Sequence, residues 1–295
     1  MCSHGIQFDI LKLQKLLQLD FKEVESTLTP RDAMLYALGI GVGDRTNDPR
    51  DLQYVYERGL KVFPAQANVI CHPGAWMQNP ELEIDWVKLL HGEQAFEVRQ
   101  PLEPGKTYLG RCKITGVIDK GAGKGAQLFF RKELREKGVE DPVCTVTSTY
   151  ILRGDGGCGG TGSQAPTPHA LPQRLPDQTV TLEVSPRAAL TYRLSGDYNP
   201  IHVDPEIASQ AGFERPILHG LCTLGMATRA ILQGYCADQP ERLQALQLRF
   251  SAPVYPGETL ATDLWCDGDV VSFCTRVSER GVMVLNHGRA VFRPA

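Results

Sequence analysis

The sequence lacks the features that mark a membrane-spanning or secreted chain. No run of apolar residues approaches the roughly 18 that are needed to cross a bilayer. Residues 1–20 hold no basic region followed by a long apolar stretch, so we expect no secretory signal. The last residues, Arg-Pro-Ala, are not a peroxisomal Ser-Lys-Leu address. These absences predict a cytoplasmic protein that has no membrane partner.

The sequence also lacks the excess of positive charge that nucleic-acid-binding proteins have and the cysteine spacing of a zinc site. The net charge is −3, which argues against a dedicated nucleic-acid partner. The nine cysteines are an odd number, and none form a Cys-x-x-Cys pair or sit near histidines at zinc spacing. We therefore expect no metal site and a reducing compartment. With 295 residues, 42% of them apolar, the chain is long enough for one large or two modest domains with a real core.

The most informative feature that is present is an internal repeat. Residues 30–38 (PRDAMLYAL) match residues 186–194 (PRAALTYRL) at Pro, Arg, Ala, Tyr and Leu. Residues 101–108 (PLEPGKTY) match residues 253–260 (PVYPGETL) at nearly the same offset. Two matched blocks in the same order predict a duplicated chain whose halves have ordinary domain size.

Residues 154–178 separate the two halves. They are rich in Gly and Pro with few large apolar side chains, which predicts a linker that buries little surface. A phosphate-binding glycine loop is the alternative, but the Gly-Lys-Ser/Thr ending is missing and no helix is expected to follow. We expect an N-terminal half at 1–153, the linker at 154–178 and a C-terminal half at 179–295.

Both halves show the same order of expected elements. In the second half, residues 179–184 alternate like a strand, Pro186 begins a short helix, and residues 219–232 form a longer helix. Strands are expected near 94–100, 106–118, 126–136 and 142–153, and again near 243–251, 259–266, 270–278 and 282–293. In the first half, residues 85–90 are the nearest helical-looking counterpart of the long helix. Helix against antiparallel sheet, twice over, is an α+β architecture.

One loop combines a carboxylate with an imidazole. It reads Ser-Gly-Asp-Tyr-Asn-Pro-Ile-His over 195–202, so Asp197 and His202 lie five residues apart on a turn stiffened by Gly and Pro. Such a pair suits general acid–base chemistry on a shared water. The alternative is a turn and helix cap, which Asp, Asn, Gly and Pro also favour.

Two observations favour chemistry at this loop. The first copy continues over residues 39–49 with turn formers but no histidine, so a turn alone does not require the Asp-x-Asn-Pro-x-His arrangement. Downstream, His219 and Gly220 open the long helix, where unpaired N–H groups are expected. Gly220 lets a ligand carbonyl approach closely, as in an oxyanion hole. We assign His219 to capping that helix and not to catalysis.

Residues 195–225 (SGDYNPIHVDPEIASQAGFERPILHGLCTLG) resemble the signature of the MaoC-like hydratase 2 family. That family includes the hydratase part of peroxisomal multifunctional enzyme type 2 and the stand-alone enoyl-CoA hydratases 2. Residues 90–94 (LHGEQ) and 154–160 (GDGGCGG) extend the resemblance to nearly the whole chain. It implies a double hot-dog fold, in which each half is a long helix wrapped by an antiparallel sheet and the second half forms the active site.

The resemblance also implies residue roles. Asp197 and His202 hold and activate a water and transfer the protons, and Asn199 orients the pair. The N–H of Gly220 binds the thioester carbonyl. A trans-2-enoyl-CoA becomes a (3R)-3-hydroxyacyl-CoA with no metal or redox cofactor. The residues implied in acyl-CoA binding are His91, Gly92, Lys120 and Phe250.

The residues themselves leave alternatives open at the acyl-CoA positions. Lys120 begins a basic run that could neutralise CoA phosphates, or that could simply be a solvated strand edge; the run continues with Lys124, Arg131, Lys132, Arg135 and Lys137. Phe250 suits the core equally well, and His91 alone would be a structural histidine.

Other functions remain to be weighed against hydration. A hot-dog thioesterase would not need the Asp-x-Asn-Pro-x-His loop, an acyl-carrier-protein dehydratase would run the same chemistry backwards, and a non-catalytic acyl-CoA binder would keep only the fold. The half without catalytic residues is free to widen for an acyl tail, which favours medium or long chains. The family further implies a homodimer and, in a eukaryote, a peroxisomal location for which no C-terminal signal is seen.

Overall fold

The computed structural model describes residues 13–44 and 48–294. Outside these ranges lie Cys2, much of the N-terminal stretch tested for a signal, the middle of the 39–49 loop and the final alanine. Within the described residues, no helix has the length and apolar character that crossing a bilayer requires.

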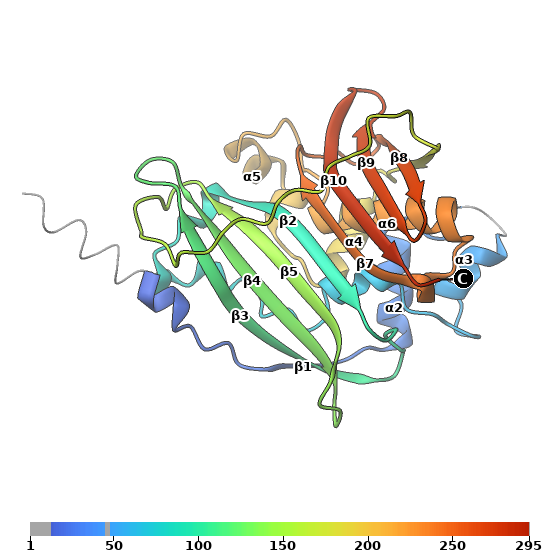
Figure 1. Cartoon of the computed structure of the whole chain (residues 1–295), viewed down its shortest axis with the longest axis horizontal. Coiled ribbons are helices and arrows are strands. Elements are labelled where there is room, and N and C mark those ends of the chain that lie inside the picture. The colour runs from blue at the N-terminus through green and yellow to red at the C-terminus, as the bar shows by residue number, and fades with distance from the viewer. Residues whose placement is uncertain (1–12, 45–47, 295) are drawn as a thin grey trace, which may run out of the picture.

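Ten strands form one continuous antiparallel sheet (Figure 1). Their bounds are β1 Val24–Thr27, β2 Leu89–Val98, β3 Thr107–Asp119, β4 Ala126–Glu136, β5 Pro142–Leu152, β6 Gln178–Glu183, β7 Leu243–Phe250, β8 Thr259–Asp267, β9 Val270–Val277 and β10 Val282–Phe292. Across the sheet the order is β1-β3-β4-β5-β2-β7-β10-β9-β8-β6. Outward from the centre, β2-β5-β4-β3-β1 mirrors β7-β10-β9-β8-β6, which supports the duplication; the exact boundaries of the halves stay a prediction.

The strands form where apolar residues recur at every second position. In β4 the inward side chains are Ala126, Leu128, Phe130, Lys132 and Leu134, all buried, while their neighbours are more exposed. A period of two places one set of side chains on the core face of a sheet. Lys132 is the one charged member of the inward set in β4.

Helices cover one face of the sheet (Figure 1). They are α2 Pro30–Gly39, α3 Pro49–Val55, α4 Ala188–Tyr192, α5 Pro205–Gln210 and α6 Gly220–Cys236. The two repeat blocks are α2 and α4, which pack on each other, and their matched tyrosines Tyr36 and Tyr192 meet with ring centroids 5.7 Å apart. Gly39 allows this approach, because a Cβ there would lie 3.2 Å from the Tyr192 Cα.

The long helix is present only in the second half of the described chain. The expectation of a helix over 85–90 was wrong: Trp86–Lys88 is a single 3-10 turn, and Leu89 already begins β2. A 3-10 segment of five residues, Pro64–Asn68, packs against β2, β5 and α6 instead. Prolines at 64, 73 and 80 interrupt this stretch, and each removes a backbone donor that a helix needs.

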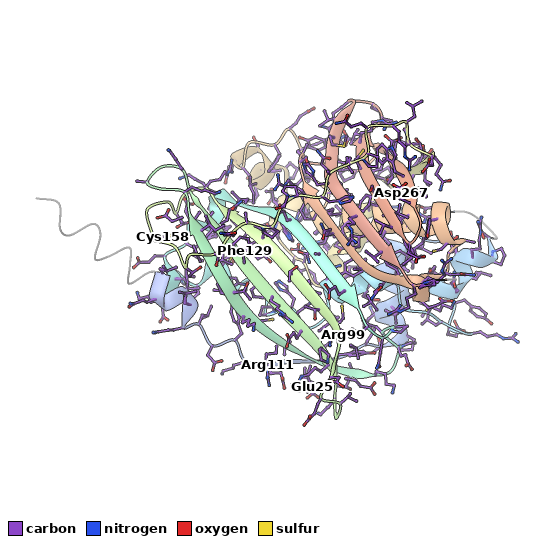
Figure 2. All side chains as sticks on the ribbon, viewed as in Figure 1. Glu25, Arg99, Arg111, Phe129, Cys158 and Asp267 are labelled. Atoms are coloured by element: carbon purple, nitrogen blue, oxygen red, sulfur yellow. The ribbon has the colours of Figure 1, made fainter. Side chains whose placement is uncertain are left out.

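The glycine-rich start of the linker packs against the first half, although its composition predicted little burial. Asp155 and Cys158 are buried, and Cys158 lies beside the sheet of the first half (Figure 2). The N–H groups of Gly157 and Gly159 donate to the Asp119 carboxylate at 2.8 and 2.9 Å. Hydrogen bonds to one carboxylate thus replace the apolar burial that the composition lacks. The rest of the linker crosses the sheet face opposite the helices (Figure 1).

Candidate active site

The loop that carries Asp197 is held by its own polar groups. Gly196 adopts a φ of 119°, which ends the short helical segment after α4. The Asn199 N–H donates to the Asp197 carboxylate at 3.2 Å, and the Ile201 N–H donates to the Asn199 side-chain oxygen at 3.2 Å. Asn199 therefore caps the 3-10 turn Pro200–His202. Asn199 links Asp197 to the turn that carries His202. The turn and helix cap that the sequence offered as an alternative to chemistry are therefore both present.

His202 is fixed in one tautomer by a backbone carbonyl. Its Nδ1 lies 2.8 Å from the Ile217 oxygen. Because a carbonyl only accepts, Nδ1 carries the proton and Nε2 keeps its lone pair in the neutral ring. Burial lowers the pKa of His202, although the Ile217 hydrogen bond and the Asp197 charge act in the opposite direction. At neutral pH the ring is therefore an uncharged base.

His219 joins this pair, which the sequence did not indicate. Its ring stacks on His202 with centroids 3.7 Å apart, and its Nε2–H donates to the Asp197 backbone oxygen at 3.1 Å. Burial and then the His202 charge lower the pKa of His219 to about 4. His219 is the N-cap residue of α6, but its side chain makes no cap hydrogen bond. His219 therefore caps the helix, as expected, and does so through its backbone oxygen, which accepts from the Cys222 and Thr223 N–H groups.

The three side chains converge on a small volume. Asp197, His202 and His219 each offer one ligand atom, and these atoms lie within 4.8 Å of one another. Two groups that bind one water at about 2.8 Å lie about 4.6 Å apart, whereas two nitrogen ligands of tetrahedral zinc lie about 3.4 Å apart. Because 4.8 Å is an upper bound, the separations are compatible with a shared water and equally with a metal ion.

The first half supplies the opposite wall of the site. Gly220 begins α6, and a Cβ on it would lie 3.3 Å from the Phe250 ring. The Phe250 ring lies 4.8 Å from that of His91, which lies 5.0 Å from that of Tyr150. Burial lowers the pKa of His91 to about 4, while hydrogen bonds to Gln94 and to the Glu93 backbone, and the nearby Asp197 charge, oppose it in part.

Gly92 lies at a β-bulge of β2 against β5, directly after His91. A Cβ on Gly92 would lie 2.8 Å from the Ile151 side chain, so only glycine lets the two strands approach here. The bulge lies directly beside His91, whose ring contacts Phe250, while the rest of β2 keeps its pairing with β5.

Lys120 stands apart from these residues. It is exposed at the turn between β3 and β4, where its N–H donates to the Gly125 carbonyl at 3.0 Å. The ring contacts and hydrogen bonds described for the other site residues do not reach it. The basic run is not one patch either, because Lys132 is buried and Arg135 and Lys137 form ion pairs with Glu23 and Glu25.

Comparison with known proteins identifies the relatives of this arrangement. Residues 26–154 match the model of the MFE-2 hydratase 2 N-terminal domain, and residues 168–287 match that of the MaoC like domain. The enoyl-CoA hydratase 2, peroxisomal, of Arabidopsis thaliana is 37% identical over 92% of each chain. The peroxisomal multifunctional enzyme type 2 of Mus musculus is 34% identical over 92% of this chain, which spans 37% of that enzyme.

Solved structures agree with the sequence matches. A MaoC-like dehydratase from Phytophthora capsici superposes with a TM-score of 0.82 at 34% identity, covering 96% of this chain and 99% of that one. A Mycobacterium tuberculosis protein described as a double hot-dog fold gives a TM-score of 0.56 at 16% identity over 93% and 95% of the two chains, which supports the fold alone.

The chain is thus an α+β protein with a double hot-dog fold, as expected, although within residues 13–44 and 48–294 only the second half has the long helix. It belongs to the MaoC-like hydratase 2 family and is a hydro-lyase. The resemblance noted in the sequence is confirmed.

Proposed function

We propose that this protein hydrates trans-2-enoyl-CoA to (3R)-3-hydroxyacyl-CoA, and that the reaction is reversible. The observation that carries the proposal is the convergence of Asp197 and His202 next to the first residue of a long helix. Relatives named enoyl-CoA hydratase 2 support the substrate class.

In this mechanism a water lies between the Asp197 carboxylate and the free Nε2 of His202. The N–H of Gly220 donates to the thioester carbonyl, because the first residues of a helix have no intrahelical acceptor for their N–H groups. This polarisation makes C3 electrophilic, since charge that develops at C2 spreads onto the oxygen. The water oxygen bonds to C3, one water proton is taken up by the pair, and the pair delivers a proton to C2.

A cavity in the first half supports a medium or long acyl chain. Its volume is about 260 Å³, and the residues that line it are Leu19, Asp20, Phe21, Lys22, Val24, Pro73, Trp76, Asn79 and Leu82. Aromatic rings run from it toward the site: Trp76 stacks on Phe130 at 5.7 Å, Phe130 lies 6.3 Å from Tyr150, and Tyr150 contacts His91. In this proposal the tail follows these rings, and Lys120 meets a CoA phosphate at the surface.

The test replaces each acid–base group in turn. Asp197→Asn and His202→Ala should fold normally and hydrate a 2-enoyl-CoA roughly 10²–10⁴ times more slowly. Hydration is followed by loss of the enoyl-thioester absorbance. If both variants kept wild-type turnover, the assigned mechanism would be wrong.

The same assay separates the alternatives. Release of free thiol would indicate a thioesterase, and binding without turnover would indicate a non-catalytic acyl-CoA binder. Faster turnover of the same acyl group on acyl carrier protein would indicate a dehydratase that serves that carrier. A homodimer, and a cytoplasmic or peroxisomal location, stay predictions.

A further inference from the structure

A chain of buried polar groups lies beside the Pro64–Asn68 turn, which packs against β2 and β5 of the first half. Lys132 points inward from β4, and only 1% of it is exposed. Its ammonium donates to the carbonyls of Asn68 and Ile70 at 3.0 and 2.5 Å. These carbonyls belong to the Pro64–Asn68 turn and the residues just after it, which have no helix partners. Lys132 therefore anchors the backbone of Asn68.

The orientation of the Asn68 amide follows from its first partner. Its Nδ2 lies 2.8 Å from the Ala65 carbonyl, and because a carbonyl only accepts, this atom must be the N–H₂ end. The oxygen of Asn68 then faces Gln94, whose Nε2 donates to it at 2.7 Å. Asn68 and Gln94 are both buried.

Each hydrogen bond in this chain fixes the orientation of the next side chain. With its nitrogen committed to Asn68, Gln94 turns its oxygen toward Ser148, which donates at 2.7 Å, and toward the Nε2 of His91 at 2.8 Å. An amide oxygen only accepts, so His91 Nε2 must carry a proton. Burial lowers the pKa of His91 to about 4, so at neutral pH the ring carries this one proton. The Glu93 backbone, which also hydrogen-bonds the ring, must share this one proton, and Nδ1 then keeps its lone pair as an acceptor.

We propose that Asn68 and Gln94 are positioning residues that hold His91 as its Nε2–H tautomer, so that Nδ1 accepts a hydrogen bond from an N–H or O–H of the bound acyl-CoA. The inference rests on the proposed function, because it takes His91 as a contact of that substrate. The pantetheine arm offers amide N–H groups of the required kind. A histidine free to change tautomer would instead present a donor to the same group in part of its population.

The first test reads the tautomer without any turnover. Two-dimensional ¹⁵N–¹H correlation on the ¹⁵N-histidine-labelled full chain distinguishes Nε2–H from Nδ1–H rings, and a His91→Gln variant identifies the signal. We expect the Nε2–H form, unchanged from pH 8 to pH 6. An Nδ1–H ring, or a mixture of the two forms, would overturn the proposal.

The second test changes Gln94 alone. Gln94→Glu keeps the size but gives His91 an anionic partner and leaves Asn68 facing an oxygen, so the pKa of His91 should rise. The ring should become doubly protonated within the range from pH 8 to pH 6. The KM for a 2-enoyl-CoA should increase about 3- to 10-fold, the range expected for one lost hydrogen bond, with a smaller change in kcat.

Two further variants keep the test decisive. Ser148→Ala removes a donor to Gln94 but leaves its oxygen facing His91, so tautomer and KM should stay as in the wild type. Gln94→Leu, for use if Gln94→Glu does not fold, should release the tautomer and raise KM without adding charge. A lowered melting temperature with wild-type tautomer and KM would mean that Gln94 is only structural. Should the wild type show the expected tautomer but no hydratase activity, the proposed function fails and the network does not.

Discussion

Replacing His219 with phenylalanine separates packing from hydrogen bonding at the site. The phenyl ring can still stack on His202, but the Nε2–H that donates to the Asp197 carbonyl at 3.1 Å is lost. Asp197 is exposed and the bond is only partly buried, so its loss costs about 0.5–1.5 kcal/mol. In the proposed mechanism this carbonyl belongs to the residue that holds the water, so we expect the cost to appear as a displaced carboxylate.

If the whole cost falls on the transition state, kcat decreases by about 2- to 13-fold, because 1.36 kcal/mol corresponds to a factor of ten. KM should change little, since His219 has no proposed contact with the acyl-CoA. The assay is loss of enoyl-thioester absorbance at several substrate concentrations, with thermal unfolding measured in parallel.

His219→Gln is the matched control, because its amide can donate to the same carbonyl although it cannot stack as a ring. It should recover most of the kcat that phenylalanine loses. If phenylalanine lowered the melting temperature but left kcat unchanged, His219 would be a core residue and the reasoning would be refuted.

Three other outcomes follow from the same geometry. Gly220→Ala keeps the N–H but places a methyl 3.3 Å from the Phe250 ring, so kcat should fall about tenfold. A second change, Phe250→Leu, should restore part of the lost kcat. An unaffected kcat in Gly220→Ala would argue against a ligand at this helix start. The lowered pKa values of His91 and His219, both about 4, mean that the unfolded chain binds more protons between about pH 6.5 and 4. The free energy of unfolding should therefore decrease with falling pH in that window, by up to about 1.4 kcal/mol per unit for each histidine, and urea titrations in which replacing either histidine leaves the slope unchanged would contradict this. Trp76→Arg should lower kcat/KM for a long-chain enoyl-CoA and spare crotonyl-CoA, and an equal loss on both would place the acyl tail elsewhere.

Much of the fold was predictable because its signals are local. Alternating apolar residues and Gly or Pro turns predicted most strands to within a few residues. The two repeat blocks form α2 and α4. The absence of a long helix from the described part of the first half was not predictable, because it depends on what fills the space beside the sheet. There a short turn and the buried Lys132 replace it, and no periodic pattern signals that exchange.

The sequence by itself determined the loop over residues 195–202: its Asp, Asn, Gly and Pro build a turn and a cap through contacts only two residues apart. Only the tertiary structure decided what surrounds that loop. His219 is 22 residues from Asp197 and His91 is 106 residues away, so their meeting depends on α6 packing under the sheet and on β2 pairing with β7. Hydrogen-bond polarity inside a core likewise depends on which carbonyl faces which amide, and this is settled by packing between elements that are distant in the chain.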